Sequence, residues 1–110
     1  MRFFRSERVG SLIQEELSKI LVREIEFPSG VLATIVSVDV DKKLERAKIG
    51  LSVIPSANAA AALEAVNRRA GELQFLLART LNIKPMPRLL FFIDHGHEHA
   101  AEIEKKFLDS

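Results

Sequence analysis

The 110-residue chain contains no cysteine, no tryptophan and no tyrosine. Without cysteine it has no disulfide, no thiolate nucleophile and no cysteine-based zinc site, which fits a reducing compartment. Seven phenylalanines must therefore supply all of the aromatic surface.

Long hydrophobic runs are also missing. No apolar stretch approaches the ~20 residues that a bilayer crossing needs. The first eight residues, MRFFRSER, lack the apolar region of a secretory signal peptide. We therefore expect a cytoplasmic protein without membrane contact. A chain of this length buries a single core, so we expect one domain over residues 1–110, and a monomer.

Catalytic signatures are absent from the sequence as well. It has no nucleophile elbow, no P-loop and no dinucleotide-binding fingerprint. Two carboxylate pairs, Glu15 with Glu16 and Glu102 with Glu104, fall on exposed faces of predicted helices, where solvation explains them better than acid–base chemistry. We expect no enzymatic activity and no cofactor, so the functional question is what the chain binds.

Charge of both signs is present but segregated. The net formal charge is only +1, which is small for a nucleic-acid-binding protein. Basic residues are concentrated in residues 42–48 and 68–88, whereas acidic residues dominate residues 94–110. Such segregation can create a positive face on a nearly neutral protein.

The first half of the chain shows two hydrophobic periods, first that of a helix and then that of β-strands. Residues 6–26 have the three- and four-residue spacing of an amphipathic helix. Its apolar face comprises Val9, Leu12, Ile13, Leu17, Ile20 and Leu21. Residues 33–40 and 46–54 alternate as two strands joined by a short polar loop, which predicts an antiparallel hairpin. On the first strand Val36, Val38 and Val40 are predicted to share one face, and Ile35, Ser37 and Asp39 the other. On the second strand the predicted inward residues are Ala47, Ile49, Leu51 and Val53.

The second half contains an alanine-rich helix over residues 57–82. Its apolar stripe comprises Ala59, Leu63, Val66, Ala70, Leu73 and Leu77. Gly71 lies inside this helix and costs roughly 1 kcal/mol relative to alanine, so it marks either a break in the helix or a tolerated glycine. Residues 88–94 are apolar on both faces, as is typical of a central strand. The apolar pattern of residues 98–108 predicts a final helix. The predicted fold is α+β, a three-stranded sheet with helices on one face.

Basic residues around the glycine suggest a phosphate site. If the helix breaks at Gly71, its second part begins with free backbone N–H groups flanked by Arg68 and Arg69. The candidate RNA-binding residues are Arg5, Arg8, Lys42, Lys43, Arg46, Lys48, Arg68, Arg69, Gly71, Arg79, Lys84 and Arg88. A solvated, merely solubilising face is the alternative. Apart from Phe75 the basic stretches lack aromatic residues, which favours recognition of backbone and shape over base stacking.

Three histidines at alternate positions, His95, His97 and His99, could ligate one metal ion in an extended segment. No second set of ligands accompanies them, and surface histidines explain the pattern well. We therefore expect no metal site.

The order of elements resembles the KH domain of type II topology, although the chain has no GxxG motif. An ordered set of local motifs resembles the ribosome-binding factor A family. These motifs are Arg5-Ser6-Glu7-Arg8-Val9, Glu16-Leu17-Ser18-Lys19-Ile20-Leu21, Thr34-Ile35-Val36-Ser37-Val38, Asp41-Lys42-Lys43-Leu44-Glu45-Arg46-Ala47-Lys48, Arg88-Leu89-Leu90-Phe91-Phe92-Ile93-Asp94 and the closing Ile103.

The resemblance implies a non-enzymatic factor that binds the small ribosomal subunit and its 16S rRNA and promotes late maturation, including growth in the cold. It also implies that an Ala-x-Gly interruption replaces GxxG; here Gly71 is the glycine and Arg69 stands at the alanine position. The alternative is a protein-interaction module that uses the exposed side of Leu90 and Phe92, or the final helix.

Overall fold

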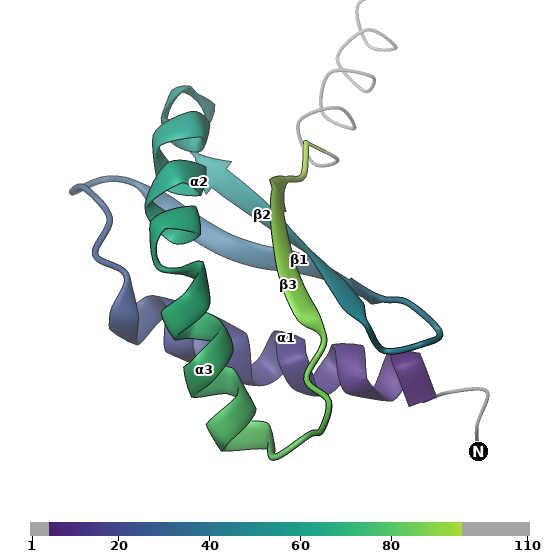
Figure 1. Cartoon of the computed structure of the whole chain (residues 1–110). Helices are drawn as coiled ribbons and strands as arrows, with labels where there is room; N and C mark the ends of the chain where they lie inside the picture. Colours follow the sequence, from purple (N-terminus) through teal and green to yellow (C-terminus); the bar gives the residue numbers. More distant parts are fainter. Residues whose placement is uncertain (1–4, 96–110) are drawn as a thin grey trace, which may run out of the picture.

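The computed structural model describes residues 5–95 of the chain (Figure 1). The elements follow the order α1 (Arg5–Glu24), β1 (Leu32–Val40), β2 (Arg46–Ile54), the short 3-10 helix η2 (Ser56–Asn58), α2 (Ala59–Arg68), α3 (Ala70–Leu81) and β3 (Arg88–Ile93). This order confirms the predicted α+β arrangement as far as the last strand. The helix predicted over residues 98–108 lies outside the described residues. Within residues 5–95, no helix combines the length and hydropathy that a bilayer crossing requires.

The sheet has the strand order β1-β2-β3. β1 and β2 pair antiparallel, as the hairpin pattern predicted, and β3 adds parallel to β2. β3 is therefore an edge strand, and its predicted central position is wrong. It is apolar on both faces for a different reason: Leu89 is buried under the helices, whereas Leu90 and Phe92 on the outer face stay 37% and 40% exposed.

All three long helices pack on one face of the sheet, with α2 and α3 running beside β3 (Figure 1). The core lies between the helices and the sheet. Both layers contribute residues with no exposed surface: Ile13, Leu17, Ala47, Ile49, Leu51, Val66, Leu73 and Leu77. These residues belong to the predicted apolar faces of residues 6–26, 46–54 and 57–82. The helix and hairpin periodicities therefore identified most of the core.

Strand β1 departs from simple alternation. Its register with β2 shifts between Ile35 and Ser37, which marks a β-bulge. A bulge inserts one unpaired residue, so the side chains before it point to the opposite face of the sheet from the one that strict alternation predicts. As a result Ile35 and Val40 are both buried, while Val36 is 37% exposed. The prediction that Val36 shares a face with Val40 is wrong, because period-two alternation takes no account of bulges.

The long alanine-rich helix does break, but not at Gly71. α2 ends at Arg68, α3 begins at Ala70, and the intervening Arg69 has φ −109° and ψ 14°. Gly71 lies in the first turn of α3. The predicted break is thus two residues too late, because contacts of the Arg69 side chain, rather than glycine flexibility, accompany the change in direction.

Candidate nucleic-acid interface

Arg69 joins the helix break to the end of α1. Its guanidinium donates to the backbone carbonyl of Glu24, and its Nη2 lies 3.3 Å from Glu24 Oε1. The same nitrogen lies 2.6 Å from Oε2 of Glu72 in the first turn of α3. The hydrogen bond to Glu72 is the main reason that the pKa of Arg69 lies above its ordinary value, with a smaller contribution from Glu24. Arg69 is therefore a fixed cation that ties α3 to α1.

Neither arginine at the break is unpaired. Arg68 Nη2 lies 2.8 Å from Glu64 Oε1, in an exposed pair one helical turn apart. Exposed pairs of this kind contribute only ~0.2–1 kcal/mol, so Arg68 can exchange partners readily. Arg69 is held by two carboxylates, and its charge is compensated where it stands. The break consequently carries less positive potential than Arg68-Arg69 suggests in the sequence.

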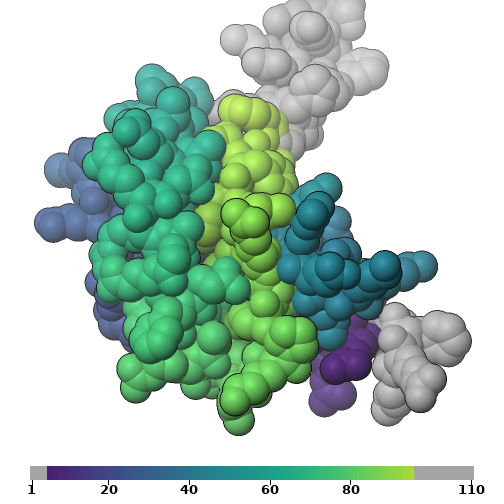
Figure 2. Space-filling view, viewed as in Figure 1, coloured from purple at the N-terminus to yellow at the C-terminus, as the bar shows by residue number. Residues whose placement is uncertain are grey.

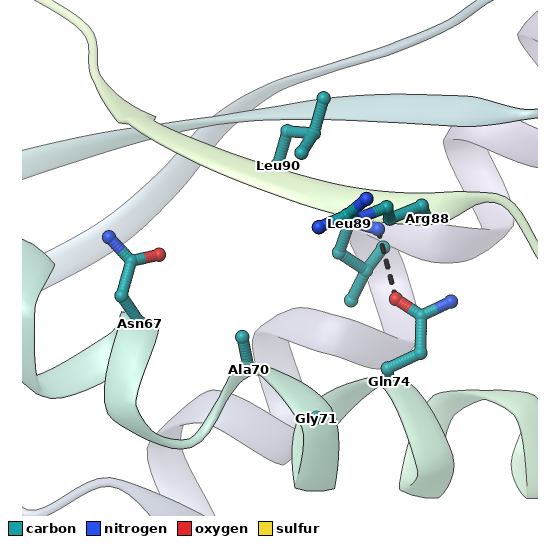
Figure 3. Close-up of a pocket in the computed structure, with 7 residues that line it drawn as sticks. All are labelled: Asn67, Ala70, Gly71, Gln74, Arg88, Leu89 and Leu90. Carbon is teal, nitrogen blue, oxygen red and sulfur yellow. Dashed lines mark hydrogen bonds between the residues drawn. The ribbon is translucent and has the colours of Figure 1, made fainter.

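A groove of about 420 Å³ lies between the break and β3 (Figure 3). Its walls are formed by Asn67, Ala70, Gly71, Gln74, Arg88, Leu89 and Leu90. A side-chain Cβ added to Gly71 would meet no atom within 4 Å. The space beside this glycine is therefore open to a ligand rather than required by the packing of the described residues.

Gln74 fixes the opposite wall of the groove. Its Nε2 donates to the carbonyl of Pro87 at 2.7 Å, and its Oε1 accepts from the backbone N–H of Leu89 at 2.9 Å. At the start of β3, this amide side chain thus forms the hydrogen bonds that a neighbouring strand would otherwise form. No pattern in the sequence indicated this role, because it depends on α3 lying beside the strand edge.

Two arginines stand side by side where β2 and β3 begin. Arg46 and Arg88 are register partners in the parallel ladder, and both are exposed. Within residues 5–95 neither guanidinium forms an ion pair with an acidic side chain. Like charges placed opposite each other on adjacent strands destabilise a sheet. The pair therefore contributes no ion-pair stabilisation within residues 5–95 and leaves two positive charges side by side on the surface.

The tip of the β1–β2 hairpin adds two lysines next to this pair. Asp41 Oδ1 accepts from the backbone N–H groups of Glu45 and Arg46, at 2.7 and 3.3 Å. Leu44 adopts a left-handed conformation, φ 59°, and buries its side chain in the core. The loop is thereby fixed, and Lys42 and Lys43 are exposed to solvent.

The start of α1 reaches the same end of the molecule (Figure 1). A Cβ added to Gly10 would lie 3.6 Å from Val40 Cγ2, so this turn of α1 packs against the end of β1. Arg5 and Arg8 are exposed on the preceding turns. In the space-filling view this helix start lies directly beside the hairpin (Figure 2).

The predicted basic residues thus fall into two groups. We call the first the basic end; it comprises Arg5, Arg8, Lys42, Lys43, Arg46, Lys48 and Arg88. The second surrounds the break and α3: Arg68 and Arg69 are paired with acids, Arg79 lies 5.8 Å from the ring centre of Phe75, and Lys84 is exposed in the connection to β3. Arg88 belongs to the basic end and also lines the groove, so it connects the two.

Of the three histidines, His95 alone falls in the part of the chain that the structure describes. No cluster of three or more His, Cys, Asp or Glu side chains within that part is placed to hold a metal ion. His97 and His99 lie outside it.

The helix break before the last strand, together with the groove that it forms with β3, defines a KH-like domain of type II topology. In KH domains a loop between two helices clamps the nucleic-acid backbone. The crystal structure of ribosome-binding factor A from Thermus thermophilus shares the fold, with a TM-score of 0.70 and 22% identity over 80% of this chain and 94% of that chain.

Sequence comparison specifies the family. The family model of ribosome-binding factor A matches residues 5–107, and the chain belongs to this family. The ribosome-binding factor A of Pseudomonas syringae pv. tomato is 34% identical over 104 residues, which are 92% of this chain and 75% of that protein. The Saccharophagus degradans protein is 35% identical over 95 residues, or 84% and 74% of the two chains.

Proposed function

We propose that this chain is a cytoplasmic assembly factor that binds the small ribosomal subunit through its 16S rRNA and promotes late rRNA maturation, including in the cold. The observation that carries the proposal is the Arg46–Arg88 pair. It is a repulsive arrangement, exposed and without an ion pair within residues 5–95, which a polyanion would relieve.

A relative supports the choice of partner. A homology model of the Thermus thermophilus ribosome-binding factor A has been fitted into a cryo-EM map of a 30S complex with that factor. It superposes with a TM-score of 0.60 at 26% identity, over 76% of this chain and 92% of that one.

We propose a different role for each part of the interface. The basic end binds phosphates, and Lys84, Arg79 and Arg68 extend the contact along α3 and the break. Gly71 lets the RNA backbone approach the first turn of α3, where no side chain caps the helix N-terminus. Arg69 acts indirectly, by holding that turn against α1. Recognition is then of backbone and shape at this site.

Co-sedimentation with purified small subunits over a series of salt concentrations tests the proposal. The logarithm of the association constant should fall linearly with the logarithm of the salt concentration, by ~0.7–0.9 for each phosphate that is neutralised. If each of the seven cations of the basic end neutralises one phosphate, the slope should be about −5 to −6. Absence of association at low salt, or association that ignores salt, would contradict the proposal.

Gly71→Ala separates stability from binding. Alanine at this helical position should raise the free energy of unfolding by about 0.5–1 kcal/mol, because no described atom obstructs the new methyl group. Association with small subunits should weaken, since the methyl group occupies the approach to the backbone. Chemical denaturation and co-sedimentation measure the two effects.

Thr80→Ala, at the exposed far end of the same helix, is the matched control and should leave association unchanged. Gly71→Ala protein that binds subunits as tightly as the wild type would show that the RNA backbone does not approach this turn.

A further inference from the structure

The outer face of the sheet carries an aromatic side chain in line with the basic end. Three successive register pairs face outward along β2 and β3: Arg46 with Arg88, Lys48 with Leu90, and Gly50 with Phe92. Phe92 is 40% exposed and Leu90 is 37% exposed. Phe92 lies four residues after Arg88 on the same strand, and parallel pairing places it on the same outer face as Arg46, two outward-facing pairs away.

The Phe92 ring packs against Gly50, where no side chain obstructs it. A Cβ at position 50 would lie 3.1 Å from Phe92 Cζ and would overlap the hydroxyl of Ser37, which donates to Asp94 Oδ2 at 3.4 Å. The tip of the ring therefore rests on the strand backbone. The ring is thus held on the surface of the sheet, where a ligand can contact it, and does not contribute to the core.

A depression of about 440 Å³ adjoins the ring and is lined by Lys48, Leu90, Phe91 and Phe92. Leu90 also lines the groove at the helix break, as does Arg88. A strand of RNA that leaves the groove can therefore cross the edge strand onto the outer face without losing contact.

We propose that Phe92 is a stacking platform for an unpaired base of the bound RNA, with the adjoining phosphates bound by Lys48, Arg46 and Arg88. A positively charged track beside an exposed aromatic ring is the arrangement by which proteins bind single strands. The inference rests on the proposed RNA binding and adds a second contact on the sheet face, separate from Gly71.

Charge sets the direction of this contact. Two carboxylates lie near Phe92 and Lys48: Asp94 Oδ2 would be 3.2 Å from a Cβ on Gly50, beside the ring tip, and Asp39 is the register partner of Lys48 on β1. At the other end, Asp41 Oδ1 accepts from the backbone N–H groups of Glu45 and Arg46, and within residues 5–95 neither Arg46 nor Arg88 forms an ion pair. Phosphates are therefore favoured at the Arg46–Arg88 end, and the base at Phe92, roughly 13 Å away along the strand.

The absence of tryptophan from the chain makes a direct test possible. Phe92→Trp introduces a single tryptophan, keeps an aromatic ring, and should bind protein-free 16S rRNA as the wild type does. Its fluorescence should be quenched as rRNA is added. Phe92→Ala should weaken the same binding about fivefold to a hundredfold, with an unchanged salt slope because no phosphate contact is lost.

Val22, 79% exposed on α1 and outside the proposed interface, supplies the matched control. Val22→Trp should show no quenching by rRNA, and Val22→Ala should bind with unchanged affinity. Circular dichroism confirms that each variant is folded, and the Phe92→Trp quenching stands independently of any loss of stability in Phe92→Ala.

Each of the other outcomes contradicts the stacking contact, and each gives a different pattern of binding. Salt-dependent binding by the wild type with no effect of Phe92→Ala and no quenching overturns the stacking contact but leaves the proposed function standing. Weaker association of Phe92→Ala with intact small subunits, but not with protein-free rRNA, assigns the face to a protein partner. Failure of the wild type to bind either probe removes the proposed function itself.

Discussion

Reversing the charge of Arg46 and Arg88 together should lower affinity for the small subunit about 100-fold or more at low salt. Charge-assisted hydrogen bonds contribute ~1.5–3 kcal/mol each, and glutamates at both positions would add repulsion from phosphates. The fold should be little affected, since the two glutamates would replace one exposed like-charge pair with another. Co-sedimentation and denaturation measure the two quantities.

Lys19→Glu with Arg23→Glu is the matched control. It changes the net charge by the same amount on α1, where both residues are paired with neighbouring glutamates. We expect a much smaller loss of affinity from this variant. Equal losses in the two double variants would mean that net charge, rather than the basic end, governs association.

Leu73→Ala should lower the free energy of unfolding by about 2–5 kcal/mol, the range for truncating a fully buried leucine. Leu73 is 0% exposed, and its N–H donates to the Arg69 carbonyl at 2.9 Å. Its side chain therefore anchors the first turn after the break. Small domains are stable by ~5–15 kcal/mol, so the variant should melt at a clearly lower temperature. Urea and thermal denaturation provide the measurement.

Val22→Ala is the control for this change, because Val22 is 79% exposed on α1. It should alter stability by no more than about 0.5 kcal/mol. A similarly small effect of Leu73→Ala would show that the turn after the break unfolds separately from the core.

Local patterns determined the elements. The three- and four-residue spacing of α1 and the alternation in β2 each reflect one buried face, which the sequence displays directly. Residue 36 and the helix break were misassigned because a bulge and a side-chain contact override periodicity. The edge position of β3 was missed because exposed Leu90 and Phe92 look the same in the sequence as buried residues.

For the interface, the sequence by itself determined which residues are basic, whereas Gly71 left open a break in the helix, which the structure places at Arg69. Only the tertiary structure decided which of those charges are available. Glu24 neutralises Arg69 across 45 residues of sequence, whereas Arg46 and Arg88 meet across the parallel ladder with no acid between them. Charge compensation and stacking depend on distance in space, and parallel pairing creates neighbours that no local pattern encodes.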